Sequence, residues 1–274
     1  MQHSTLARKS PFAYLAVHGA FLSRQGVMTN RVLNLARQLS IVVRYRFFAA
    51  RSDPRSMYEF VNVLTRFHYK RKRSALPESD VSELLPSASL ASAMTLFSPP
   101  PEFFSIDIDE LQVLCKFMQA LAPQRVFEFG TFDGFTTLHL AAHAPTGCEV
   151  LTIDRLAGSY NFSPLRRFPH AINVGGRFHG HPLAGRIRQL TGDTRTFDFA
   201  PWAGTCDLVF LDADHGEEGT QIDTGNAMML LKPGGVLLWH DCFAEGVAKF
   251  LAGFSATHPV VRIRSTTLAM HRKA

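Results

Sequence analysis

Acidic residues are absent from the first 52 positions of this 274-residue chain. Residues 1–73 carry 14 lysines and arginines against two acids, Asp53 and Glu59, whereas residues 74–274 carry 15 basic and 21 acidic side chains. The positive charge therefore belongs to an N-terminal arm, and the rest of the chain is acidic. Because nucleic-acid binding needs a basic face, we expect no nucleic-acid partner for this acidic body.

Cysteine is scarce and scattered. The four cysteines are Cys115, Cys148, Cys206 and Cys242. None belongs to a C-x-x-C pair, which argues against a zinc knuckle or a disulfide framework and favours a reducing compartment. An uninterrupted apolar run of about 18 residues, the length that a membrane-spanning helix needs, is also missing. We therefore expect a cytoplasmic protein.

The length and composition suit a globular α/β protein with an extension, or two small domains. Hydrophobic residues make up 46% of the chain and charged residues 19%, which is enough for a sizeable core. Residues 74–101 contain five prolines among serines and alanines, a composition typical of a linker. The predicted organisation is a basic helical arm over residues 1–73, a linker over 74–101 and a domain over 102–274.

The basic arm alternates arginines with apolar residues. This pattern favours helices over about 29–50 and 55–69, with a break near Pro54. Three interpretations stay open for it. The arm packs on its own domain with its arginines solvated, or it docks on an anionic membrane surface or a partner, including a second copy of the chain. Its Arg-rich, acid-poor composition is also that of an organellar transit peptide.

The stretch V-F-E-F-G-T-F-D-G over residues 126–134 predicts a buried strand, a glycine turn and a helix behind it. Gly130 and Gly134 let the backbone turn tightly and admit a ligand, and the helix start offers unpaired N–H groups. The G-x-G-x-x-G fingerprint of dinucleotide binding is missing its middle glycine here. Glu128, at the end of the strand, would repel a diphosphate but tolerate a cationic ligand.

Two further strands are predicted to end near this turn. Residues 149–154 end in Asp154, twenty residues beyond Gly134, where nucleotide-binding α/β domains place a carboxylate for ribose hydroxyls. Residues 187–193 form a strand and turn ending in Asp193, which either approaches the ligand or caps a helical turn. The long irregular segment between them is expected at the rim of the site.

A second cluster of acids follows a strand at residues 206–215, C-D-L-V-F-L-D-A-D-H. A helix over about 217–231, the turn L-K-P-G-G and an apolar strand then lead to His240 and Asp241. Each part alone is ordinary, since a P-G-G turn often links a helix to a strand. Two strands at this spacing that both end in aspartate are not ordinary.

Together, these patterns resemble the motifs of the class I S-adenosylmethionine-dependent methyltransferases, over about residues 103–272. The resemblance implies a Rossmann-like, seven-stranded, mostly parallel sheet with helices on both faces and an antiparallel C-terminal hairpin. It also implies S-adenosylmethionine as cofactor and a small-molecule acceptor that is methylated on a hydroxyl. The residues that it assigns to the cofactor are Glu128, Gly130, Thr131, Gly134, Asp154, Asp193 and Asp212.

Methyl transfer from a sulfonium is an in-line displacement, so the enzyme positions an acceptor and removes its proton. The candidates for this chemistry are Asp212, His215, His240 and Asp241. Some members of the family bind a divalent cation through an acid after the fourth strand and an acidic pair after the fifth. Here Asp212 and Asp241 would hold Mg²⁺ or Mn²⁺, although His240 alters the pair. A metal-free base, with His215 or His240 paired to a carboxylate, stays open beside the metal.

Two other functions compete with this interpretation. In one, the domain is a non-catalytic binding or scaffold module that works through its basic arm. In the other, the protein is an NAD(P)-dependent oxidoreductase, which the missing glycine and Glu128 disfavour. We therefore interpret the chain as an O-methyltransferase of small molecules.

Overall fold

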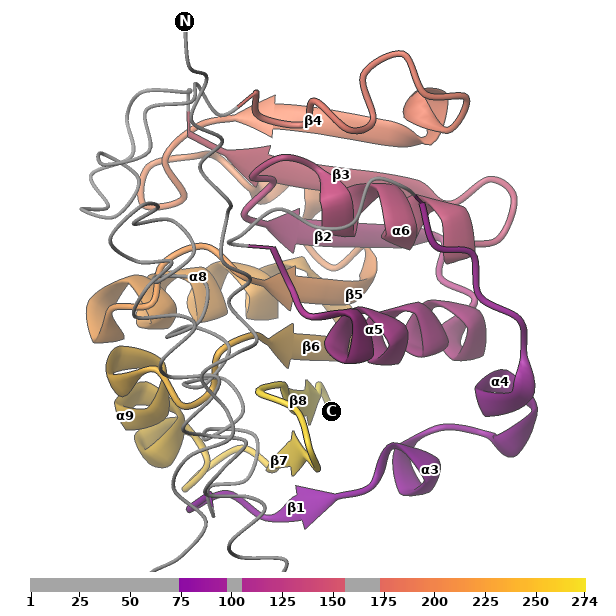
Figure 1. Cartoon of the computed structure of the whole chain (residues 1–274). Helices are drawn as coiled ribbons and strands as arrows, with labels where there is room; N and C mark the ends of the chain where they lie inside the picture. The colour runs from indigo at the N-terminus through magenta and orange to yellow at the C-terminus, as the bar shows by residue number, and fades with distance from the viewer. Residues whose placement is uncertain (1–73, 98–104, 156–172) are drawn as a thin grey trace, which may run out of the picture. The chain divides into compact units, whose positions relative to one another are not determined.

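The computed structural model describes residues 74–97, 105–155 and 173–274. The predicted basic arm and its two helices lie outside these ranges. The labels of helices and strands follow Figure 1. Among the helices of the described ranges, none combines the length and the apolar character needed to cross a membrane.

A mixed sheet of eight strands lies at the centre of the domain (Figure 1). The strands are β1 (Glu78–Ser79), β2 (Arg125–Phe129), β3 (Glu149–Asp154), β4 (Ile187–Thr191), β5 (Cys206–Leu211), β6 (Leu231–Trp239), β7 (Val260–Ile263) and β8 (Ala269–Arg272). Their order is β1-β7-β8-β6-β5-β2-β3-β4. Neighbours from β6 to β4 are parallel, whereas β8 is antiparallel to both β6 and β7. The predicted seven strands and the antiparallel hairpin are confirmed, and β1 is an addition.

Helices cover both faces of the sheet. They are α3 (Val81–Leu84), α4 (Ser87–Ala91), α5 (Ile108–Leu121), α6 (Phe135–His143), α8 (Glu217–Leu230) and α9 (Glu245–Phe254), with short 3-10 helices at Ala184–Arg186 and Ala200–Trp202. Helices α5 and α6 lie on one face and α8 and α9 on the other (Figure 1). The predicted α/β class with helices on both faces is therefore confirmed.

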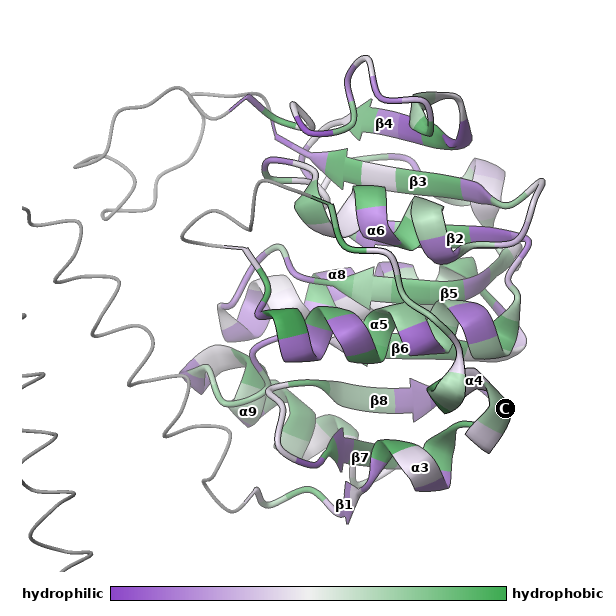
Figure 2. Ribbon diagram, turned by 45° about the vertical axis from the view of Figure 1, so that its right-hand side comes forward, coloured by the Kyte–Doolittle hydropathy of each residue, from purple (hydrophilic) through white to green (hydrophobic). Residues whose placement is uncertain are grey.

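The core divides into two layers because successive side chains of a strand point to opposite faces. In β5, Leu208 and Phe210 join α5 and α6, whereas Val209 and Leu211 join α8 and α9. A strand covered on both faces reads as a continuous apolar run, which is why residues 206–211 gave such a clear signal. Figure 2 shows β5 coloured mainly as hydrophobic, and β4, at the sheet edge, with a larger hydrophilic share.

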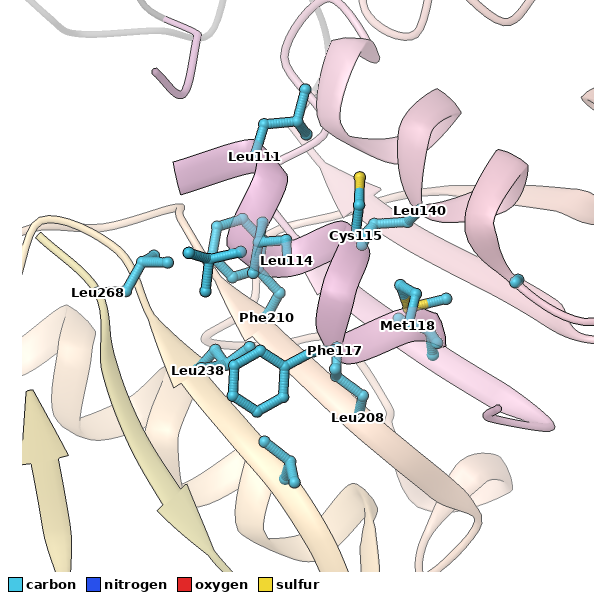
Figure 3. Close-up of a cluster of buried hydrophobic side chains, with 14 of the residues drawn as sticks. Leu111, Leu114, Cys115, Phe117, Met118, Leu140, Leu208, Phe210, Leu238 and Leu268 are labelled. Carbon is cyan, nitrogen blue, oxygen red and sulfur yellow. The ribbon is translucent and has the colours of Figure 1, made fainter. Parts of the chain in front are cut away.

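Helix α5 provides much of the first layer. Leu114 and Phe117 are fully buried on the helix and pack in one cluster with Phe210 and Leu238 of the sheet (Figure 3). Burying one such side chain contributes roughly 1.5–3 kcal/mol. This packing fixes the position of the first turn of α5, which carries an acid discussed below.

Residues 74–97, predicted as a linker, pack against the domain. Strand β1 pairs with β7 in parallel, and Glu78 forms an ion pair with the buried Arg262. Further along, the N–H groups of Thr95 and Phe97 donate to histidines on α6. A strand of two residues has no hydrophobic period of its own, so its pairing depends on tertiary contacts that the sequence pattern does not reveal.

The direction in which successive strands are added to the sheet reverses between β2 and β5. Strands β3 and β4 extend the sheet on one side of β2, whereas β5 and β6 extend it on the other side. Ligands of open α/β sheets bind beyond the carboxyl ends of the strands at such a point. Gly130 lies there with φ of +99°. A Cβ on Gly130 would come within 2.2 Å of the backbone oxygen of Asp212, so only glycine permits this close approach of the two strand ends.

Candidate active site

The glycine turn after β2 is closed by backbone hydrogen bonds. The N–H of Gly130 donates to Ile153 (2.9 Å), and the N–H of Gly134 donates to Thr131 (2.8 Å). Helix α6 then starts with the N–H of Phe135 donating to Oδ1 of Asp133 at 2.9 Å. The start of α6 therefore already holds a carboxylate, which leaves it poorly suited to a diphosphate.

Asp154 lies directly beside this turn. Its Oδ2 accepts the N–H of Phe132 at 2.7 Å, and its Oδ1 accepts the N–H of Arg155 at 2.7 Å. On the next strand, Asp193 forms an ion pair with Arg155 at 3.0 Å. A hydrogen bond from the N–H of Arg195, helped by the charge of Arg155, lowers the pKa of Asp193. The structure thus places both predicted acids at the ends of adjacent strands.

Glu128 lies beneath the turn and is completely buried. Its Oε2 accepts the hydroxyls of Thr137 and Thr152, and Thr152 in turn contacts the hydroxyl of Thr131 at 2.7 Å. Burial raises the pKa of Glu128 to about 8, so the carboxyl is mostly protonated at neutral pH. Glu128 and Thr131 were predicted to bind cofactor; both side chains are buried and brace the turn from below.

The segment after residue 172 folds against the glycine turn. The N–H of Gly175 donates to Phe132 at 2.8 Å, and the ring of Phe178 lies 2.6 Å from where a Cβ of Gly134 would stand. Arg177 forms an ion pair with Asp133 at 2.5 Å. This part of the long irregular segment therefore lies at the turn, as predicted, and residues 156–172 are outside the described ranges.

The second predicted group forms at the ends of β5 and β6, whose arrowheads point to the same edge of the sheet in Figure 1. Asp212 follows β5, and its N–H donates to Phe129 at 2.9 Å. His240 and Asp241 follow β6, and Asp241 has φ of +49°, a left-handed conformation that aspartate tolerates better than most residues. His215 approaches from the loop before α8.

His240 is held between two carboxylates. Its Nδ1 lies 2.9 Å from Oδ1 of Asp212, and its Nε2 lies 3.1 Å from Oε2 of Glu110. Ionised carboxylates only accept hydrogen bonds, so both ring nitrogens carry protons and the ring is an imidazolium. Burial lowers the pKa of His240, but the charges of Asp212 and Asp241 and the hydrogen bonds outweigh it and raise the pKa well above its ordinary value. The predicted base His240 therefore has no lone pair to offer.

His215 is the accessible histidine of the group. Its side chain is 40% exposed, against 2% for His240. Its Nε2 lies 3.4 Å from Oδ2 of Asp241 and 3.7 Å from Oδ1 of Asp212. Burial lowers the pKa of His215, but the hydrogen bond to Asp241 and the charge of Asp212 outweigh it, and the pKa is raised.

The predicted Mg²⁺ or Mn²⁺ site can be judged from these contacts. Asp212, His215 and His240 offer ligand atoms within 4.8 Å of one another. However, both nitrogens of His240 are hydrogen-bonded to carboxylates, and hard divalent cations prefer oxygen ligands. Among the four residues predicted for this site, Asp212 and Asp241 then remain as oxygen donors, and both lie beside histidines. The donor set does not fit the predicted metal.

Glu110 was missed as a site residue. It is not among the predicted site residues, yet its side chain is 0% exposed and contacts His240. A signal for this was present. Glu110 precedes Leu114 by four residues and Phe117 by seven, so helical spacing places it on the buried face of α5.

Comparisons with known proteins agree with the domain described here. Residues 127–242 match a family model described as a methyltransferase domain. No curated protein matches the chain. Three solved structures share low identity with it. The first is the O-methyltransferase TomG from Streptomyces achromogenes in complex with S-adenosylmethionine, with 18% identity over 63% of this chain and 83% of that chain and a TM-score of 0.48. The second is an O-methyltransferase from Bacillus cereus in complex with S-adenosylhomocysteine, with 17% identity over 73% of this chain and 93% of that chain and a TM-score of 0.47. The third is the S-adenosylhomocysteine-bound methyltransferase PaMTH1 from Podospora anserina, with 14% identity over 78% of this chain and 95% of that chain and a TM-score of 0.49. Because these scores lie below 0.5, we draw no argument from these structures, and the match to the methyltransferase-domain model is confined to residues 127–242.

Proposed function

We propose that this chain, whose residues 127–242 match the model of a methyltransferase domain, transfers a methyl group from S-adenosylmethionine to a hydroxyl of a small molecule. The observation that carries the proposal is the placement of acids at the strand ends. Asp133 and Asp154 lie at the glycine turn, and Asp212 and Asp241 lie where an acceptor would meet the cofactor. The acidic surroundings favour a sulfonium that also carries an amino group.

The same acids speak against the nicotinamide alternative. A diphosphate bound at the start of α6 would meet the carboxylate of Asp133, which already accepts the first N–H group of that helix. Asp154 carries a further negative charge at the turn. A cationic methyl donor is attracted by the charges that would repel a dinucleotide.

His215 is the base that we propose for the acceptor proton. Its Nε2 faces the carboxylates of Asp212 and Asp241, so in the neutral ring that nitrogen keeps its proton and Nδ1 carries the lone pair. Bound S-adenosylmethionine would supply an electrophilic methyl group, whose bond to sulfur would break as the acceptor oxygen took the methyl carbon, with the electron pair returning to sulfur to give S-adenosylhomocysteine. His215 would take the hydroxyl proton of the acceptor at Nδ1.

The two carboxylates give this base its strength. A carboxylate beside a histidine fixes the tautomer and stabilises the imidazolium that forms in the reaction. The raised pKa of His215 follows from these contacts, with burial acting against them. The rate should therefore rise with pH as His215 loses its proton.

Calorimetric titration with S-adenosylmethionine, alongside NAD, tests the cofactor. We expect S-adenosylmethionine to bind and NAD to give no heat. Asp154→Asn should weaken binding roughly tenfold, because a hydrogen bond to a charged group is lost. The matched control is Asp198→Asn, since Asp198 is exposed and its Oδ1 accepts only a local N–H. Heat from NAD alone would overturn the proposal.

Turnover is then tested with a panel of phenols and sugars by following release of S-adenosylhomocysteine, with and without Mg²⁺ and a chelator. We expect methylation of at least one hydroxylated acceptor, unchanged by the chelator. Binding of S-adenosylmethionine without turnover on any acceptor would favour the scaffold alternative. Activity that depends on Mg²⁺ would contradict the metal-free base.

A further inference from the structure

Glu110 joins three parts of the domain from inside the core. It lies in the first turn of α5, and its side chain is 0% exposed. Its Oε2 meets Nε2 of His240 at 3.1 Å, and its Oε1 accepts the N–H of Thr267 at 2.5 Å, from the turn between β7 and β8. A buried carboxylate is costly unless its oxygens are paired, and both oxygens of Glu110 are paired here.

The contact with His240 continues toward the proposed base. The other nitrogen of His240 binds Oδ1 of Asp212 at 2.9 Å, and the same oxygen lies 3.7 Å from Nε2 of His215. The ring of His240 is 2% exposed, so little of it faces solvent. Its contacts with Asp212 and Glu110 are those of a side chain that orients other residues of the site.

We propose that Glu110 is a positioning residue of this site: by holding the ring of His240, it fixes the carboxylate of Asp212 beside His215. The proposal rests on the proposed function for its catalytic meaning. The contacts themselves run from α5 through the end of β6 to the end of β5. The fixed positive charge of His240 lies where the resemblance implied part of a metal site.

The chemistry of Glu110 makes a selective test available. Two donors, the N–H of Thr267 and Nε2–H of His240, converge on its two oxygens. Glutamine at this position has one oxygen and one NH₂ group, so it can accept only one of them and must oppose the other. Glu110→Gln therefore loosens the network while keeping the volume of the side chain.

The experiment follows ring ¹⁵N signals of histidine-labelled protein through a pH titration, for the wild type and Glu110→Gln. We expect His215 in Glu110→Gln to hold its proton less tightly, by roughly tenfold in proton affinity, because Asp212 is no longer fixed beside it. Glu149→Gln is the matched control, since Glu149 starts β3 at the opposite end of the sheet. It should titrate like the wild type.

Two further variants keep the test decisive if Glu110→Gln folds poorly. Glu110→Asp keeps the charge and should partly restore the wild-type titration of His215. His240→Asn leaves Glu110 bound to Thr267 but removes the ring that holds Asp212, so it should also lower the proton affinity of His215. Folded variants in which His215 titrates as in the wild type would show that Glu110 is structural only, and would overturn the proposal.

The titration needs neither cofactor nor acceptor, so it separates this proposal from the proposed function. If wild-type protein fails to bind S-adenosylmethionine, the proposed function falls while the titration still reports on Glu110. If Glu110→Gln binds S-adenosylmethionine like the wild type and transfers methyl roughly tenfold more slowly, the positioning role is supported. If the titration of His215 changes in Glu110→Gln while turnover stays at the wild-type rate, the positioning role is contradicted.

Discussion

Two pairs of histidines in this domain contact different kinds of group, carboxylates in one pair and backbone groups in the other. At the ends of β5 and β6, His215 and His240 face carboxylates, and the pKa of each is raised against the effect of burial. On α6, His139 and His143 face backbone groups, and burial lowers the pKa of each. The first pair is held near the positive form and the second in the neutral form.

The hydrogen bonds of the α6 pair define its protonation. Nδ1 of His139 donates to the carbonyl of Phe135 at 2.7 Å, and Nδ1 of His143 donates to the carbonyl of His139 at 2.7 Å. The Nε2 atoms accept the N–H groups of Phe97 (3.1 Å) and Thr95 (3.0 Å). Because an N–H group can only donate, each Nε2 must keep its lone pair.

The comparison teaches that the partners of a histidine, more than its burial, decide its use. Both His240 and His139 are buried, but carboxylates contact His240, whereas the nearby Arg177 and His143 disfavour a positive charge on His139. The α6 pair accepts hydrogen bonds from Thr95 and Phe97 and so holds this segment against the helix. The pair at the strand ends orients acids and offers a base. A variant that alters one pair leaves the other as an internal reference.

The largest effect is expected from His215→Gln. Removal of a general base typically lowers the rate about 10²–10⁴-fold, and this variant should do so with little change in affinity for S-adenosylmethionine. Turnover and calorimetry measure the two quantities. His258→Gln, beyond α9, serves as the matched control. A rate within threefold or so of the wild type would remove His215 as the base.

A second prediction concerns a buried acid without a cationic partner. The pKa of Glu128, about 8, lies above its ordinary value of 4.5, so its contribution to stability is present below about pH 4.5 and is lost as the pH rises toward 8. Glu128→Gln stays neutral and keeps one oxygen for Thr137 and Thr152. Relative to the wild type, it should gain up to a few kcal/mol in free energy of unfolding between these pH values. Denaturant unfolding at several pH values measures this, and parallel pH profiles would refute it.

The α6 pair predicts a pH dependence of opposite direction. The folded pKa of each histidine lies below 6.5, so the unfolded chain binds protons first as the pH falls. The contribution of the two histidines to the free energy of unfolding is complete above about pH 6.5. It is lost as the pH falls through their lowered pKa values. Replacing both with glutamine should flatten this part of the stability profile and cost about 1 kcal/mol for each hydrogen bond lost. The exposed His179 provides the control, as His179→Gln should leave the profile unchanged.

The smallest effect is expected from Thr95→Pro. Proline lacks the N–H group that Nε2 of His143 accepts, so the variant should lose about 1 kcal/mol of stability and let the pKa of His143 rise. Thr95→Ala keeps the N–H group and should behave like the wild type. Histidine ring signals and thermal unfolding report the two effects. Equal behaviour of the two variants would show that the backbone N–H does not set the protonation of His143.

Much of the fold could be predicted because its signals are local. The strand at 149–154 is observed with the predicted bounds, and the helix predicted at about 217–231 is observed at Glu217–Leu230. The apolar runs of buried parallel strands and the glycine turn carry this information in short windows. The grouping of Asp212, His215, His240 and Asp241 followed from parallel strands ending at one edge of the sheet.

What the sequence could not predict depends on contacts between distant segments. Glu110 meets His240 across 130 positions, and this contact changes His240 from a candidate base into a charged support. Burial of Glu128 beneath the turn depends likewise on Thr137 and Thr152. Strand β1 is too short to show any period, so its pairing with β7 was missed.

Carboxylates hold His240 charged, whereas backbone groups hold His139 and His143 neutral. Long-range ¹H–¹⁵N spectra of the histidine-labelled wild-type protein near pH 7.5, a value about one unit above the ordinary histidine pKa, test this difference directly. We expect both ring nitrogens of His240 to be protonated, and His139 and His143 to be protonated only at Nδ1. A neutral ring at His240, or a charged ring at either α6 histidine, would contradict the account.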